Sequence, residues 1–207
     1  MKKLIAVSAL ALLAALGIGT PATAKSPQVV DPATVTPALN PDFAPWSCFK
    51  AGSGIICQAE FRPAYENEPI GLQCDGQDVY ISGTGREFMT RWHTADGLAT
   101  KTIVHLDYPD DRFSLSASGD GPSVSVRGHW NRHYVYPVPG DRDSRVLTEV
   151  GAIYLVSGSG EGLVLQDTGR VTFEPGQDFE LVASMHGVHD HYQDPTYIDT
   201  VICDALT

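Results

Sequence analysis

The chain has 207 residues, and its 25 acidic and 14 basic side chains give it a formal net charge of −11. This excess of acidic groups disfavours binding to nucleic acids and to anionic membrane surfaces, because both are themselves negatively charged. The length is sufficient for a domain with a substantial hydrophobic core.

The first 24 residues have the pattern of a secretory signal peptide. Lys2 and Lys3 precede an apolar run, and Ala22-Thr23-Ala24 forms a cleavage site of small residues. The apolar run is shorter than the roughly 20 residues that cross a bilayer as a helix. We therefore expect residues 1–24 to be removed, leaving a secreted, extracellular protein that has no contact with the membrane.

Residues 25–45 contain five prolines and no glycine. Proline fixes one backbone dihedral and lacks an amide hydrogen, and the apolar residues here follow neither a helical nor a strand period. We expect an extended, loosely held N-terminal linker over residues 25–45 and a β domain over residues 46–207.

From residue 55 onward, short apolar runs alternate with turn residues. Asp96-Gly97 and Asp120-Gly121 are typical hairpin turns. The expected strands cover 55–61, 70–74, 77–83, 86–94, 99–107, 112–117, 123–136, 145–156, 162–166, 169–173, 179–185 and a last run at 197–203. About ten short strands without a helical period predict an all-β fold. We expect an antiparallel meander that forms a closed or nearly closed barrel and so removes its edges, with a sandwich as the alternative.

Four cysteines lie in the mature part of the chain, and an even number in an exported protein indicates two disulfides. Three pairings are possible, of which we favour Cys48–Cys57 with Cys74–Cys203. No C-x-x-C pair is present, which disfavours a zinc site.

The longest expected strand has an aromatic face and a polar face. In residues 123–136 the alternation places Val124, Val126, Trp130 and Tyr134 on one side. These side chains line a ligand cavity if the barrel is wide and form the core if it is narrow. The candidate ligand-binding residues are Trp92, Trp130, Tyr134 and Tyr154.

Three histidines fall within six residues, at His186, His189 and His191. Neutral imidazole is a ligand for zinc, copper and nickel, so these three are the metal candidates. The segment lies between an expected strand and Pro195, which favours a polar surface loop over a metal site.

Two glutamates, Glu87 and Glu149, lie in apolar strand segments. A carboxyl group buried among aromatic residues has a raised pKa and can act as a general acid or base. Arg91 and His105 are its expected partners if these glutamates point inward, whereas an outward orientation makes them ordinary surface residues. We recognise no nucleophile motif and expect no cofactor.

Several short segments resemble a group of exported actinobacterial β-domain proteins without an assigned function. The resemblance lies in Cys74-Asp75-Gly76-Gln77-Asp78-Val79, Ser82-Gly83-Thr84-Gly85-Arg86, the Asp96-Gly97 hairpin, Gly160-Glu161-Gly162-Leu163, Thr168-Gly169-Arg170-Val171 and Val201-Ile202-Cys203-Asp204-Ala205-Leu206. It implies a small secreted β domain with one cysteine near the first strand and one at the end, and it implies no activity. The group is similar in architecture to calycin-like and allene-oxide-cyclase-like barrels, a similarity that does not determine function.

Three functions are compatible with these features. A secreted barrel that binds a small apolar or amphipathic molecule explains the aromatic face. A cyclase or isomerase requires Glu87 or Glu149 beside that cavity. A protein-interaction or inhibitor domain has a filled core and an exposed patch near residues 137–144. The sequence contains no convergent polar site, so binding ranks above catalysis.

Overall fold

The computed structural model describes residues 26–193 and 196–207, apart from positions 159 and 161. The expected signal peptide at residues 1–24 lies outside these residues. The described chain is all-β, with one antiparallel sheet of 11 strands and short helices at its two ends. None of the described helices is long and apolar enough to cross a membrane.

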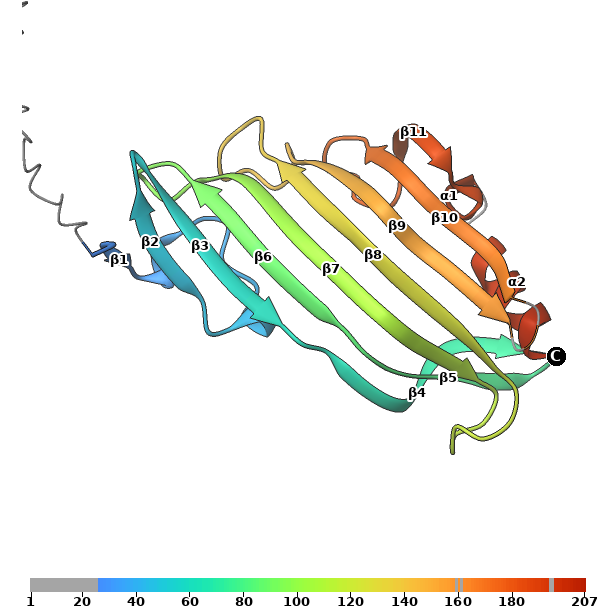
Figure 1. Ribbon diagram of the computed structural model, residues 1–207. Coiled ribbons are helices and arrows are strands. Elements are labelled where there is room, and N and C mark those ends of the chain that lie inside the picture. The colour runs from blue at the N-terminus through green and yellow to red at the C-terminus, as the bar shows by residue number, and fades with distance from the viewer. Residues whose placement is uncertain (1–25, 159, 161, 194–195) are drawn as a thin grey trace, which may run out of the picture.

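Most strands that are neighbours in the sheet are also consecutive in the chain (Figure 1). Its main path lists β1 (Val29–Val30), β2 (Ser47–Ala51), β3 (Gly54–Phe61), β6 (Arg86–His93), β7 (Ala99–Ser114), β8 (Ser123–Val135), β9 (Val146–Gly158), β10 (Gly162–Phe173) and β11 (Val182–Val188). The remaining strands, β4 (Ala64–Cys74) and β5 (Gln77–Thr84), form a hairpin that extends the sheet, because β5 pairs with the second half of β7.

The expected closed barrel is not formed. In the described residues the two end strands, β1 and β11, pair only with their inner neighbours, so the sheet stays open. One edge is a strand of two residues, and such a short edge offers little backbone for further pairing. The interior is instead filled by segments from both ends of the chain.

Two long strands replace pairs of shorter expected ones. The expected strands 99–107 and 112–117 merge into the single strand β7, which ends at Ser114 and whose register shifts between Tyr108 and Asp111. Likewise β10 runs through Gly169 with register shifts of its own. Prolines and glycines were interpreted as strand ends, but a β-bulge accommodates such residues without ending the strand.

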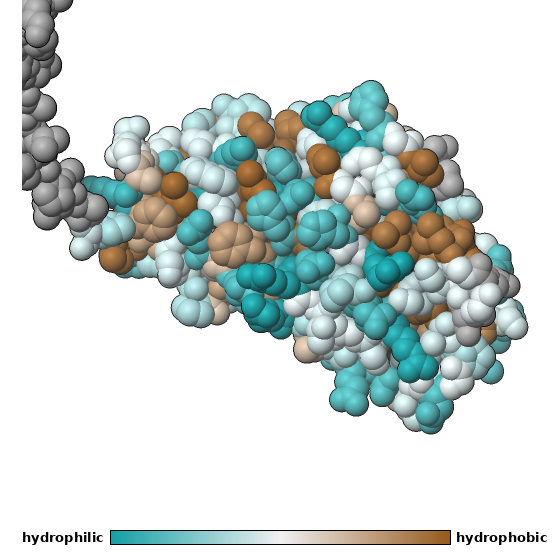
Figure 2. Space-filling view, in the orientation of Figure 1, coloured by the Kyte–Doolittle hydropathy of each residue, from teal (hydrophilic) through white to brown (hydrophobic). Residues whose placement is uncertain are grey.

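Most of the buried side chains lie on one face of the sheet, which we call the inner face. Met89, Leu106, Trp130 and Ile153 from four neighbouring strands pack together there with Phe43 of the N-terminal segment. The face of the molecule seen in Figure 2 is largely polar, with apolar residues in separate small groups. The core between the sheet and the segments that cover it consists of four clusters of buried residues.

The proline-rich segment is not the loosely held linker that we expected. Its described residues form β1, the 3-10 turns Pro32–Thr34 and Pro41–Phe43, and an extended run, and Phe43 is only 3% exposed. Thr36 exchanges backbone hydrogen bonds of 2.8 and 2.7 Å with Gly97 and Ala99. The prolines prevent regular pairing, but their carbonyl groups still accept hydrogen bonds and the apolar side chains between them still enter the core.

The C-terminal segment covers the other end of the inner face (Figure 1). After β11 come α1 (Asp190–Gln193) and α2 (Tyr197–Leu206), so the expected last strand at 197–203 is a helix. Ile202 and Leu206, one turn apart, are buried against Val126 and Val156 of the sheet. The helical period of these apolar residues was present in the sequence and was missed.

Both disulfides have the favoured pairing. Cys48–Cys57 links the paired strands β2 and β3, and Cys74–Cys203 links the β4–β5 hairpin to α2 across a sequence separation of 129 residues. Two disulfides suggest an oxidising, extracellular environment.

Candidate functional site

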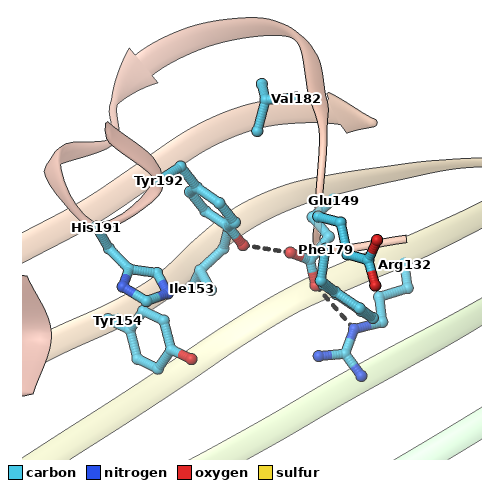
Figure 3. A pocket seen from close by; sticks show the side chains of 9 residues that line it. Arg132, Glu149, Ile153, Tyr154, Phe179, Val182, His191 and Tyr192 are labelled. Atoms are coloured by element: carbon cyan, nitrogen blue, oxygen red, sulfur yellow. Dashed lines mark hydrogen bonds and ion pairs between the residues drawn. The ribbon is translucent and has the colours of Figure 1, made fainter. Parts of the chain in front are cut away.

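A cleft remains on the inner face between the two covering segments. It consists of two small cavities of about 160 and 170 Å³ that share Arg132, Ile153 and Tyr154 in their walls. The first is lined by Tyr192, which follows β11, as Figure 3 shows. The second opens beside Trp130. We call this pair of cavities the aromatic cleft.

Glu149 of β9 is the buried polar centre of the cleft, with its side chain 1% exposed. It accepts hydrogen bonds from Trp130 Nε1 at 3.0 Å and from Arg132 Nε at 2.8 Å. Its other oxygen accepts from the Tyr192 hydroxyl (Figure 3). Burial, followed by the charge of Glu149, raises the pKa of Tyr192 far above its usual value, so Tyr192 remains a donor.

Arg132 holds the second charge of the site. Burial lowers the pKa of its guanidinium, but the Glu149 carboxylate more than offsets this, so the pKa is raised overall. The guanidinium lies 5.5 Å from the Trp130 ring and 5.0 Å from the ring of Phe179, which the β10–β11 loop places over it. Arg132 is therefore held in place by its ion pair and by two aromatic rings.

A second carboxylate, Glu87 of β6, lies at the open side of the cleft. It accepts a hydrogen bond from the hydroxyl of Tyr108, whose ring stacks on Trp130 with centroids 5.7 Å apart. Burial and this hydrogen bond raise the pKa of Tyr108. The aromatic wall is thus a stack of Trp130 and Tyr108 with polar groups at its margin.

Two glycines shape this wall. A Cβ at Gly128 would lie 2.6 Å from the Trp130 ring, and one at Gly151 would lie 2.6 Å from the His129 carbonyl oxygen. Gly151 also has φ of +138°, a conformation that other residues rarely adopt. The sequence needs glycine at both positions so that β8 and β9 can pair closely while the indole lies flat along the sheet.

At the histidine cluster, no group of three potential metal ligands converges among the described residues. His189 is buried, with Nδ1 2.8 Å from Asp167 and Nε2 3.0 Å from the His186 carbonyl oxygen. His191 instead packs edge-on against Tyr154 in the cleft, with centroids 5.1 Å apart.

Both partners of the His189 ring are oxygen atoms, one of the Asp167 carboxylate and one of the His186 carbonyl. Burial raises the pKa of Asp167, and the hydrogen bond from His189 opposes that effect. The Cβ positions of Gly169 and Gly187 lie within 3.2 Å of His189 Nε2, so the absence of side chains there makes room for the ring. The pair fastens the segment after β11 to β10.

The structure separates the four candidate wall residues. Trp130 and Tyr154 line the aromatic cleft, whereas Tyr134 lines a third cavity further along β8. Trp92 alternates with the inward-facing Arg91 and lies on the opposite face of the sheet, with the Lys101 ammonium 5.4 Å from its ring.

The expected partners of the glutamates are also placed apart. Arg91 lies in the third cavity, and the exposed His105 bonds to Asn131 on the outer face. Sequence reasoning missed Arg132, although it alternates with Trp130 and Tyr134 on one face of a strand. It also missed Tyr192, whose contact with Glu149 spans 43 residues and leaves no local signal.

The arrangement is better suited to binding than to proton transfer. Glu149 is charge-paired and its oxygens already accept from three donors, so it has little capacity left to remove a proton from a substrate. Arg132, with its side chain 29% exposed, presents a guanidinium edge to the cleft beside the rings.

Searches of protein-family models, curated proteins and solved structures found no match to this chain.

Buried His93, next to Arg91 on β6, gives the fold a pH dependence. Burial, and then the Arg91 charge, lower the pKa of His93 to about 4, against a small opposing effect of the Ile55 backbone. The native state therefore resists protonation of His93, so its contribution to stability is complete above pH 6.5 and is lost as pH falls towards 4. Between pH 7 and pH 4 the free energy of unfolding, measured with urea, should fall by about 2–3 kcal/mol less for His93→Phe than for the wild type. The control is His129→Phe, at an exposed position, which should lose as much stability as the wild type. Equal losses for His93→Phe and the wild type would contradict this assignment.

Proposed function

We propose that the protein binds a small amphipathic molecule in the aromatic cleft and works outside the cytoplasm. The main supporting observation is that Trp130, Tyr108 and Tyr154 line the cleft together with Arg132, whose guanidinium is shared by both cavities. Aromatic rings with a few convergent polar groups are typical of sites for small ligands. The ligand's apolar part lies along the rings, and an oxygen of its polar end accepts from Arg132.

The size and charge of the cleft narrow the ligand further. Its two cavities of about 160 and 170 Å³ suit a molecule of one or two rings rather than a long acyl chain. Arg132 pairs with Glu149, and the lining carries further carboxyl groups on Glu87, Asp111 and Glu180, so the cleft disfavours an anion. A neutral molecule with a hydroxyl or carbonyl group is therefore the expected class.

Calorimetric titration with 2-naphthol tests this proposal. We expect saturable heat, and for Trp130→Phe a dissociation constant about ten-fold higher, because the smaller ring loses stacking area and the indole bond to Glu149. The matched control is Trp92→Phe, the same change on the opposite face, which should bind as the wild type does. An absence of binding by the wild type, or equal effects of the two substitutions, would refute the proposal.

A further inference from the structure

A larger cavity, of about 470 Å³, lies between the N-terminal segment and the loop after β8. Three of the 14 basic residues of this acidic chain line it, namely Arg91, Arg142 and Arg145. It shares no lining residue with the aromatic cleft. We call it the arginine cavity.

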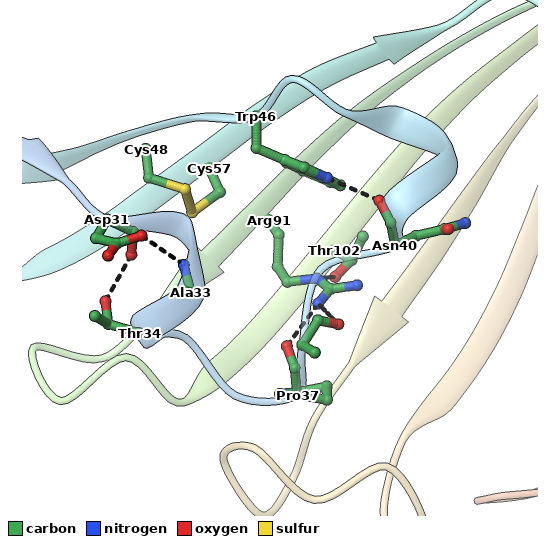
Figure 4. Close-up of a disulfide and its surroundings, with 11 residues drawn as sticks. Asp31, Ala33, Thr34, Pro37, Asn40, Trp46, Cys48, Cys57, Arg91 and Thr102 are labelled. Carbon is green, nitrogen blue, oxygen red and sulfur yellow. Dashed lines mark hydrogen bonds between the residues drawn. A yellow bond between two sulfur atoms is a disulfide. The ribbon is translucent and has the colours of Figure 1, made fainter.

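Arg91 lies at the buried floor of this cavity and is 7% exposed. Its Nε donates to the Thr102 hydroxyl at 3.2 Å, and one terminal nitrogen donates to the carbonyl oxygens of Pro37 and Ala38 at 3.1 and 3.4 Å (Figure 4). All of these partners are neutral. Within the described residues no carboxylate forms an ion pair with Arg91. A buried guanidinium without a counter-ion is costly, and an anion from solution would relieve this cost.

The two other arginines add to the positive charge. Arg145 pairs with Asp178 of the β10–β11 loop and lies 5.1 Å from the Tyr134 ring. Arg142 is exposed, and in the described part of the chain no ion pair or side-chain hydrogen bond engages it. Three guanidinium groups and one carboxylate leave an excess of two positive charges.

The three arginines line one cavity, and their charges act on one another there. Burial lowers the pKa of Arg91, and the charges of Arg142 and Arg145 are among the effects that lower it further. The field in the cavity is therefore positive, although the chain as a whole carries a formal charge of −11.

Apart from Asn40 and Thr102, the rest of the wall is apolar or aromatic. Leu39 and Pro41 come from the N-terminal segment, Met89 from β6, and Tyr136 from the chain just after β8. An inorganic ion would leave this surface unused. A ligand with one anionic group and one apolar group would match both halves of the cavity.

We propose that the arginine cavity binds a small organic anion, a carboxylate or a phosphate ester with an attached apolar group. The anionic oxygens lie between the guanidinium groups of Arg91 and Arg142, and the apolar group lies against Met89 and Leu39. Guanidinium matches the planar, two-oxygen geometry of both anions. This site is independent of the ligand proposed for the aromatic cleft.

Calorimetric titrations with phenylacetate, phenyl phosphate and neutral phenylacetamide test this proposal and distinguish the two anionic groups. We expect at least one anion to bind about ten-fold or more tightly than phenylacetamide, with binding that weakens as salt is added. Whichever anion binds more tightly identifies the preferred group.

Arg142→Gln is the informative variant, because the side chain is exposed and its loss should not disturb folding. We expect it to raise the dissociation constant of that anion about ten-fold. The control is Arg127→Gln, which removes the same charge from an exposed position of β8, on the face opposite the cavity. Thermal melts of both variants verify the fold.

Three results would overturn the proposal. They are an absence of anion binding by the wild type, equal affinity for phenylacetamide and the anions, and equal weakening by the two arginine substitutions.

Discussion

Replacing Cys74 and Cys203 together by alanine should lower the free energy of unfolding by about 5 kcal/mol. The disulfide closes a loop over a sequence separation of 129 residues, so its loss greatly increases the conformational freedom of the unfolded chain. It also joins α2 to the β4–β5 hairpin, beside the core that Ile202 and Leu206 complete. Urea denaturation followed by circular dichroism measures the change.

The second disulfide provides the matched comparison. Cys48–Cys57 spans only nine residues between neighbouring strands, and the same chain-entropy argument gives a loss of about 3 kcal/mol for the double alanine variant. Losing Cys74–Cys203 should therefore cost about 2 kcal/mol more. Equal losses, or the reverse order, would show that local packing rather than loop closure determines the effect.

Glu149→Gln should destabilise the protein by about 3 kcal/mol. The substitution leaves the Arg132 guanidinium without its counter-charge and weakens the acceptor for Trp130 and Tyr192. A fully buried pair would lose more, but the Arg132 side chain is 29% exposed and water screens part of its charge. Urea denaturation measures the loss, and Glu66→Gln on the exposed surface of β4 is the neutral control.

A double-mutant cycle separates this ion pair from general damage to the core. Arg132→Gln should also destabilise the protein, because it leaves the Glu149 carboxylate buried without its charge partner. The double variant should lose clearly less than the sum of the two single losses, since no unpaired charge remains. Strictly additive losses would mean that the two side chains do not interact.

Features that depend on neighbouring residues were predicted correctly. The Asp96-Gly97 pair connects β6 to β7, and the alternation along β8 does place Trp130 and Tyr134 on the same face. Both features follow from local backbone geometry, namely a turn that requires glycine and a strand period of two. Both disulfides formed as favoured, although the sequence alone left three pairings open.

The contacts of the candidate site could be predicted from the sequence only in part. Glu149 was named as a candidate, but its environment depends on Arg132 and on Tyr192. Period-two reasoning places Arg132 beside Trp130, whereas nothing near Tyr192 in the chain indicates that it returns to Glu149. The arginine cavity forms only because residues 38–41 fold across the sheet to face Arg91 and Arg142.

The sequence by itself determined the strand-rich class of the fold, the hairpin turns and the apolar or aromatic faces of its strands, because each depends on residues only a few positions apart. Only the tertiary structure decided whether the sheet closes and what fills its inner face. The same alternating side chains are buried in a closed barrel and in an open sheet whose inner face is covered by the two ends of the chain. The choice between them rests on long-range contacts such as those of Phe43 and Tyr192, and the same covering segments help to line the aromatic cleft and the arginine cavity.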